Sequence, residues 1–189
     1  MSTDVDWTPK ARVILDAASE LFYDQGIHAV GVEAIAARAG VTKRTLYDRF
    51  GSKERLVVEY LRARDRSWRD LLQRRLDDAD DDPAAQLSAV FGATRQWSVE
   101  RSPNGCSMIN AHAEIHDATH PAYPIIVGQK RWMLELFTRI ATDAGVTDPD
   151  AVGDQLLLLH EGSLVTYGMS VVPGSYDVAE ELGLRLLAG

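Results

Sequence analysis

The chain contains 189 residues, of which 46% are hydrophobic, 25% charged and 7% aromatic. This composition is typical of a globular protein and excludes a disordered or low-complexity chain. The single cysteine, Cys106, excludes an internal disulfide framework and a cysteine-rich zinc module. The longest uncharged run, residues 162–176, is too short for a membrane span, and the acidic N-terminus lacks the pattern of a signal peptide. We therefore expect a cytoplasmic protein with no membrane partner.

The formal net charge of −8 argues at first against nucleic acid as a partner, but the charge is unevenly distributed along the chain. Residues 1–55 hold eight basic and eight acidic side chains, whereas residues 56–189 hold twelve basic and twenty acidic ones. Within residues 38–55, only Asp48 and Glu54 oppose six basic side chains. A basic cluster is more often a solvated surface than a DNA-binding one, so its meaning depends on the secondary structure around it.

Helix signals follow one another along the whole chain, and no stretch shows the sustained alternation that is typical of a strand. Thr8 and Pro9 form a helix start, and Gly26 is suited to a left-handed helix end. Thr42 and Ser52 are further caps, each placed directly after a glycine-containing turn. The sequence therefore predicts an all-α fold of about nine helices, near residues 9–25, 32–39, 43–50, 53–77, 83–100, 106–117, 121 or 124–143, 149–169 and 177–187.

The second and third of these helices form a helix-turn-helix pattern, because both are short and a tight glycine turn joins them. In such a unit the second helix enters the major groove of DNA, and its first turn reaches the base edges. Lys43, Arg44 and Thr45 occupy that first turn. Lysine and arginine donate to guanine, threonine offers a hydroxyl or a methyl group, and the free N–H groups of the helix start favour a phosphate.

A characteristic set of small, apolar and capping residues runs through this region, namely Ala36, Ala39, Gly40, Val41, Thr42, Thr45, Leu46, Tyr47, Phe50, Ser52, Lys53, Glu54, Arg55 and Leu56. With this set, the chain resembles the tetracycline-repressor (TetR) family over about residues 10–58. Gly31 stands where that family often has a threonine, so no hydroxyl is available at the start of the second helix.

The resemblance implies a DNA-binding domain at residues 1–52 and a helical ligand-binding and dimerisation domain at residues 53–189. It implies a sequence-specific transcriptional regulator, most simply a homodimeric repressor that a small organic ligand releases from a palindromic operator. Tyr47 and Lys53 resemble contacts to the DNA backbone, although Tyr47 also suits the edge of a hydrophobic core. The predicted DNA-binding residues are Thr42, Lys43, Arg44, Thr45, Tyr47, Arg49 and Lys53.

The remaining helices are apolar enough to enclose an effector and to pair with a second copy of the chain. Most of these side chains equally suit an ordinary core. The candidate ligand-binding residues are Phe91, Trp97, Met108, Asn110, Tyr123, Trp132, Met133 and Tyr167. The candidate dimer residues are Leu156, Leu159, Gly162, Val165, Met169, Leu182 and Leu186.

Other functional hypotheses, namely a metal site, a redox sensor and an enzyme, have less support in the sequence. His112 and His116 lie four residues apart, but this spacing more often reflects satisfied or exposed histidines than a metal site, and we expect neither a metal nor a cofactor. Cys106 has no basic neighbour within a helical turn, so we expect an inert thiol rather than a redox sensor. No nucleophile elbow or phosphate-binding loop is present, so we expect no enzyme. The alternatives that remain are a ligand-dependent activator and a helical protein-binding module without DNA binding.

Overall fold

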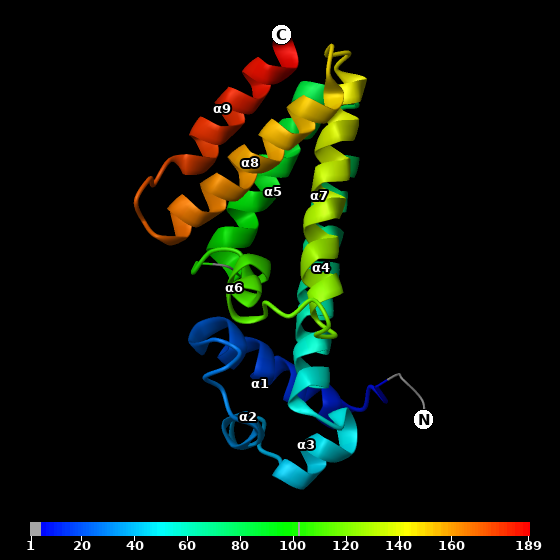
Figure 1. The fold of residues 1–189 in the computed structure, drawn as a ribbon, viewed down its shortest axis with the longest axis vertical. Helices are drawn as coiled ribbons and strands as arrows, with labels where there is room; N and C mark the ends of the chain where they lie inside the picture. Colours follow the sequence, from blue (N-terminus) through cyan, green and yellow to red (C-terminus); the bar gives the residue numbers. More distant parts are fainter. Residues whose placement is uncertain (1–4, 102) are drawn as a thin grey trace. The chain divides into compact units, whose positions relative to one another are not determined.

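The computed structural model describes residues 5–101 and 103–189, and across these residues the chain forms nine α-helices and no strand (Figure 1). The predicted all-α fold is confirmed. The helices are α1 (Pro9–Gln25), α2 (Val32–Arg38), α3 (Lys43–Phe50), α4 (Lys53–Asp77), α5 (Pro83–Arg101), α6 (Ser107–Glu114), α7 (Tyr123–Asp143), α8 (Pro149–Gly168) and α9 (Ser175–Ala188).

The helices group into two compact units. The first unit consists of the described residues up to Arg64 together with Ser107–Ile126, so it contains α1 to α3, the start of α4, α6, and the start of α7. The second unit consists of the described residues of Asp65–Cys106 and of Val127–Gly189. The predicted functional boundary after residue 52 stays a prediction.

Local capping explains why the first unit begins as three separate helices. The Thr8 side chain accepts a hydrogen bond from the Ala11 amide at 3.3 Å, and Pro9 follows it in the first turn. Gly26, with φ of 91°, ends α1, because a residue with a side chain rarely adopts this backbone conformation. The core of α1 to α3 consists of fully or nearly buried apolar side chains, among them Ile14, Ala18, Phe22, Ile35, Leu46 and Phe50.

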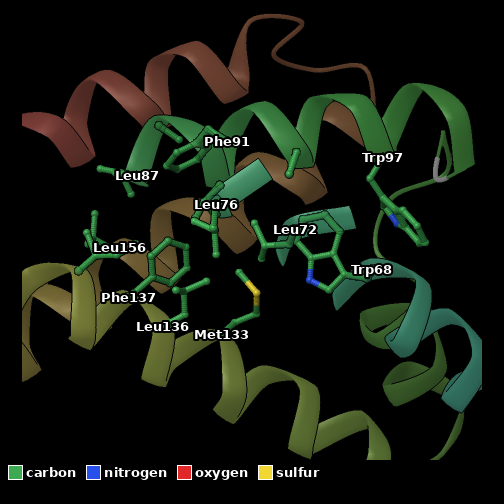
Figure 2. Packing of buried hydrophobic residues seen from close by; sticks show 14 residues of the cluster. Trp68, Leu72, Leu76, Leu87, Phe91, Trp97, Met133, Leu136, Phe137 and Leu156 are labelled. Atoms are coloured by element: carbon green, nitrogen blue, oxygen red, sulfur yellow. The ribbon is translucent and has the colours of Figure 1, made fainter. Parts of the chain in front are cut away.

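The core of the second unit is built from large apolar side chains of four helices, α4, α5, α7 and α8 (Figure 2). Phe91 of α5 and Phe137 of α7 are fully buried, and Trp68 of α4 contacts the ring of Trp97 with centroids 5.8 Å apart. The long apolar run of α8 contributes Leu156, which is also fully buried. Burial of so much apolar surface is the main source of stability for this unit.

Helix ends differ from the predicted ones by a few residues. α6 ends at Glu114, three residues earlier than predicted, and α9 begins at Ser175, two residues earlier. Within the described residues no helix combines the length and the apolar character that crossing a bilayer requires. The expectation drawn from the acidic N-terminus falls largely on residues 1–4, which lie outside the described residues.

Candidate nucleic-acid interface

Gly40, Val41 and Thr42 hold the turn between α2 and α3, and all three belong to the residues that carry the family resemblance. Gly40 has a φ of 65°, which allows the chain to reverse directly after α2. The Val41 amide donates to the Ala36 carbonyl at 3.0 Å. The Thr42 hydroxyl then accepts a hydrogen bond from the Thr45 amide at 3.1 Å, so α3 begins with a side-chain cap. The two short helices are therefore held in a defined helix-turn-helix.

The two faces of α3 differ in chemistry. Leu46 and Phe50 are buried in the core of the first unit, and this fixes the rotation of the helix about its axis. Arg44 lies on the solvent side, where 90% of its side chain is exposed. Tyr47 is 40% exposed, so it does not act as a buried core aromatic. The exposed face of α3 thus presents the guanidinium of Arg44, the ammonium of Lys43 and the phenol of Tyr47.

Each basic side chain of α3 lies within 4.0 Å of a carboxylate of the chain. Lys43 pairs with Glu33, Arg44 lies 4.0 Å from Asp48, and Arg49 lies 3.2 Å from Asp6. The hydrogen bond from Lys43 lowers the pKa of Glu33, and the same contact raises the pKa of Lys43. A phosphate that approaches these side chains must therefore compete with carboxylates that already neutralise them.

Replacement of Glu33 by glutamine is expected to strengthen DNA binding. The change removes a negative charge beside the duplex and frees Lys43 for a phosphate, so affinity at low salt should rise about three- to tenfold. Fluorescence anisotropy with a labelled duplex measures the change. Glu181→Gln is the matched control, because Glu181 pairs with Arg185 on α9. Equal affinities of the wild type and Glu33→Gln would show that Lys43 makes no contact with DNA.

Lys53 is less available than the sequence suggested. Its ammonium lies 5.9 Å from the centre of the Phe22 ring, and the residue is partly buried. Burial lowers the pKa of Lys53, and the charge of Glu114 partly opposes this shift. Its predicted contact with a DNA phosphate stays a prediction.

Glu114 is a residue of the first unit whose role the sequence did not reveal. Its carboxylate accepts hydrogen bonds from the amides of Ile27 at 2.8 Å and His28 at 2.6 Å, and it also lies 3.2 Å from the His28 ring. These bonds fasten the end of α6 to the turn after α1. The partners are 86 and 87 residues apart, and no local sequence signal joins them.

A cleft of about 270 Å³ lies in the first unit, and none of the predicted ligand-binding residues lines it. His116 and His120 line it, but within the described part of the chain no group of three metal-ligating side chains is close enough to hold an ion. The lining residues are Ile27, His28, Lys53, Glu54, Val57, Ile115, His116, Asp117 and His120.

The predicted ligand-binding residues occupy two different environments. Met108, Asn110 and Tyr123 belong to the first unit, and the other five belong to the second. Phe91 and Met133 are fully buried, whereas Trp132 is partly exposed beneath the Arg69 guanidinium, which lies 4.1 Å from its ring centre. Tyr167 packs on Tyr176 with ring centroids 4.8 Å apart, and Trp97 is 9% exposed. That they bind a ligand stays a prediction.

The predicted dimer residues divide by exposure. Leu156 is fully buried in the core, so it has no surface to offer a second copy and its assignment to an interface needs correction. Met169 is 68% exposed and Leu182 is 40% exposed. Exposed apolar side chains continue across α8, α9 and the segment between them, namely Leu158, Val165, Met169, Val171, Val172, Val178 and Leu182. We call these seven residues the α8–α9 face.

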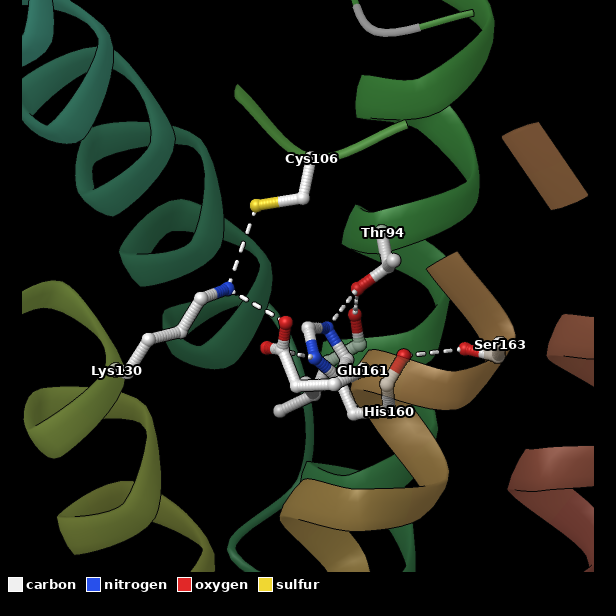
Figure 3. Close-up of polar contacts among 7 residues, drawn as sticks. Thr94, Cys106, Lys130, His160, Glu161 and Ser163 are labelled. Carbon is white, nitrogen blue, oxygen red and sulfur yellow. Dashed lines mark hydrogen bonds and ion pairs between the residues drawn. The ribbon is translucent and has the colours of Figure 1, made fainter. Parts of the chain in front are cut away.

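In the second unit, a network of polar side chains links α5, α7 and α8 with the segment before α6 (Figure 3). The Lys130 ammonium of α7 donates to the Glu161 carboxylate at 2.6 Å and to the Cys106 sulfur at 3.3 Å. His160, which is 2% exposed, contacts Glu161 at 3.1 Å and Thr94 at 3.0 Å. Cys106 therefore has a basic neighbour after all, supplied by a residue 24 positions away.

Acid is expected to weaken this unit through Glu161. Burial raises the pKa of Glu161, but the hydrogen bond from His160 and the charge of Lys130 outweigh it and bring the pKa from 4.5 to about 2. The stabilisation is complete above pH 4.5 and is lost as the pH falls towards 2, at a cost of about 3 kcal/mol. Denaturant unfolding at several pH values checks this. Glu161→Gln should show a shallower loss than the wild type, and identical slopes would contradict the assignment.

Comparisons with known proteins agree with this geometry. The family model described as "Bacterial regulatory proteins, tetR family" matches residues 14–60, which include α2 and α3. The transcriptional activator FasR of Mycolicibacterium smegmatis is 52% identical over 48 residues, which are 25% of this chain and 22% of FasR. The transcriptional repressor KstR2 of Mycobacterium tuberculosis H37Rv is 33% identical over 81 residues, which are 43% of this chain and 40% of KstR2. The matched segments thus span less than half of these relatives.

A solved structure extends the similarity to nearly the whole chain. The TetR-family transcriptional regulator SCO4454 from Streptomyces coelicolor superimposes with a TM-score of 0.83 and is 28% identical. The match covers 98% of this chain and 96% of that one. Residues 14–60 thus match the family of tetR regulatory proteins, and the chain shares the fold of a TetR-family transcriptional regulator over nearly its whole length.

Proposed function

We propose that the chain regulates transcription by binding double-stranded DNA through α3. The observation that carries this proposal is the capped start of α3, which presents Lys43, Arg44 and Tyr47 to solvent while Leu46 and Phe50 anchor the helix. An exposed helix of this kind fits the major groove, and its first turn lies closest to the base edges. Thr42, Thr45, Arg49 and Lys53 complete the proposed contact surface.

A second copy of the chain is part of the proposal. One short helix reads only a few base pairs, whereas a two-fold symmetric pair reads both halves of a palindrome. The α8–α9 face supports such a pair, because it exposes seven large apolar side chains between Leu158 and Leu182. We propose that this face forms the dimer interface.

The proposed regulator responds to a small organic molecule. A ligand shifts the protein only by its differential affinity for the states that bind and do not bind DNA. We propose that the chain is a repressor from which the ligand releases the operator. An activator is the second candidate, because FasR, which matches over the DNA-binding segment, is an activator whereas KstR2 is a repressor.

A DNA titration tests the proposal. Labelled duplexes that tile the DNA upstream of the gene are titrated with the purified chain at low salt without effector, and anisotropy is recorded. We expect one duplex to bind far more tightly than the others, with an affinity that falls steeply as salt rises. If the chain binds no duplex at low salt, the proposal is wrong, and a helical protein-binding module is the hypothesis that remains.

Arg44→Ala is expected to weaken binding to the preferred duplex and to relax its sequence preference. Loss of a guanidinium that reads one base costs about 1–3 kcal/mol per half-site. Competition titrations with duplexes that vary one base pair at a time measure the preference. Arg74→Ala removes an equal charge from an exposed position in the second unit and serves as the control. Equal weakening on every duplex would assign Arg44 to the DNA backbone instead.

A further inference from the structure

The cleft in the first unit has a buried apolar part and a more exposed polar part. Three segments form it, namely the turn after α1, the first turns of α4 and the segment after α6. The apolar part consists of Ile27, Val57 and Ile115, which are 2% to 6% exposed. Its volume of about 270 Å³ suits an organic molecule smaller than a typical drug. The polar part consists of His28, Lys53, Glu54, His116, Asp117 and His120.

The Lys53 ammonium in this cleft has no anionic partner. Among the described residues it makes neither a hydrogen bond nor an ion pair, and it lies 5.9 Å from the centre of the Phe22 ring. Burial lowers the pKa of Lys53 more than the charge of Glu114 raises it. The ammonium has therefore lost part of its hydration without gaining a counterion. An anionic ligand would supply one through a charge-assisted hydrogen bond, which is stronger than a neutral one.

His120 offers a second hydrogen-bond donor to the same cleft. The Ala122 amide donates to Nδ1 of His120 at 3.1 Å. A ring nitrogen that accepts a hydrogen bond carries no hydrogen, so the hydrogen of this ring is on Nε2. Nε2 forms no hydrogen bond with any described residue. The half-buried ring thus keeps a free N–H for a ligand in the cleft.

The carboxylates around the cleft leave Lys53 unpaired, and two of them have other partners. Asp117 accepts hydrogen bonds from the Thr119 hydroxyl at 2.7 Å and the Thr119 amide at 2.8 Å, and these bonds lower the pKa of Asp117. Glu114 accepts from two amides of the turn after α1. Glu54 is exposed to water. The cleft therefore combines open donors with acceptors that are already bonded or hydrated, and an anion completes such an arrangement.

We propose that this cleft binds a small organic carboxylate whose apolar body covers Ile27, Val57 and Ile115 and whose carboxylate meets Lys53 and His120. Burial of the apolar surface would supply much of the affinity, and the two donors would select the carboxylate. None of the predicted ligand-binding residues lines the cleft, so this is a separate site.

The charges around the cleft favour a ligand with a single negative charge. A monoanion balances the one ammonium of Lys53. A phosphate dianion would bring a second negative charge close to Glu54 and Asp117, and like charges at short range repel. An organic cation would meet the ammonium of Lys53 with no open acceptor beside it.

Occupation of the cleft has a consequence for DNA binding, and this consequence rests on the proposed function. Lys53 is part of the proposed contact surface for DNA, and its single ammonium would then be paired with the ligand. A DNA phosphate would have to displace the ligand carboxylate to reach it. The occupied chain should therefore bind DNA more weakly, whereas the binding site itself does not depend on DNA.

Calorimetric titrations with two pairs of probes test the site. Benzoate and 1-naphthoate are compared with benzamide and 1-naphthamide, which have nearly the same shapes without the charge. We expect at least one carboxylate to bind at neutral pH with a dissociation constant below about 1 mM, and its amide to bind about tenfold more weakly. In ¹⁵N spectra, the shifted amides should cluster at residues 27–28, 53–57 and 115–120. No binding of either carboxylate, equal affinities within each pair, or shifts confined to other residues would overturn the proposal.

Substitutions in the cleft test the two donors. Lys53→Met should weaken the carboxylate about tenfold and leave the weak binding of the amide unchanged, which a damaged fold would not do. His120→Asn keeps an acceptor for the Ala122 amide without the outer N–H and should weaken the carboxylate severalfold. Lys10→Met removes an equal charge from an exposed position on α1 and is the control. Circular dichroism checks folding. A folded Lys53→Met chain that binds the carboxylate like the wild type would overturn the proposal.

Anisotropy with the preferred duplex tests the link to DNA. A saturating carboxylate should weaken DNA binding about three- to tenfold, the matched amide should not, and Lys53→Met should abolish the response. Unchanged affinity with the cleft occupied would overturn the link. A chain that binds no duplex at all would contradict the proposed function instead, and the calorimetric titration, which contains no DNA, still decides the cleft.

Discussion

A chain in which glutamate replaces Leu182 is expected to be monomeric and to bind its operator at least about 100-fold more weakly, because one helix then reads only one half-site. Leu182 is 40% exposed on α9 and belongs to the α8–α9 face, where Leu158 and Met169 are exposed to 73% and 68%. A carboxylate at this position would have to lose its water in the proposed interface, which is costly without a partner. Sedimentation velocity measures the oligomeric state, and anisotropy measures the affinity.

Val99→Glu is the matched control for this experiment. Val99 is 72% exposed on α5, so the substitution introduces the same charge at an exposed apolar position outside the α8–α9 face. The control should leave both the oligomeric state and the affinity unchanged. A Leu182→Glu chain that remains a dimer would place the interface on another surface.

Gly153→Ala is expected to lower the free energy of unfolding by about 2–3 kcal/mol, because the added methyl group overfills a packed contact between two helices. Gly153 lies on α8 against α7, and a Cβ there would lie 3.0 Å from Cα and 3.1 Å from the backbone nitrogen of Thr138. It would also meet the Thr138 hydroxyl. The hydroxyl can rotate away, but the backbone of α7 cannot move without disturbing its packing. Denaturant unfolding measures the loss.

Gly92→Ala tests whether the position, and not the loss of a glycine, causes this effect. Gly92 lies inside α5, and a Cβ there would meet no atom within 4 Å. Alanine favours a helix more than glycine does, so this substitution should stabilise the chain by up to about 1 kcal/mol. If both variants behave alike, the close contact of α7 and α8 at Gly153 does not limit stability.

Local signals in the sequence were sufficient to predict the helix-turn-helix. A cap such as Thr42 and a turn such as Gly40 act within a few residues, so their effect can be read directly from the chain. Leu46 and Phe50 are four residues apart, a spacing that places them on one side of a helix, and both are buried. The orientation of the exposed side chains then follows from geometry, because the buried face fixes the rest of the helix.

Contacts between distant segments could not be predicted in the same way. Helix packing brings together the Glu114 carboxylate and the amides of the turn after α1, from which it accepts hydrogen bonds. It also brings Lys130 to Cys106. Residues 156–159 are four consecutive leucines, so they point to all sides of α8. Four apolar residues in a row show no helical periodicity that would separate buried from exposed positions. For that reason the sequence placed Leu156 on an interface, whereas packing buries it and exposes Leu158.

The carboxylates beside the basic side chains of α3 have a consequence for how the protein meets chromosomal DNA. A chain with a net charge of −8 is repelled by a duplex at long range, and its reading helix carries little unmatched positive charge of its own. Random stretches of duplex should therefore retain it only briefly. At a DNA site whose sequence α3 recognises, base edges and phosphates would take the place of these carboxylates as partners of the basic side chains. We expect this exchange to favour discrimination among sites over speed of capture.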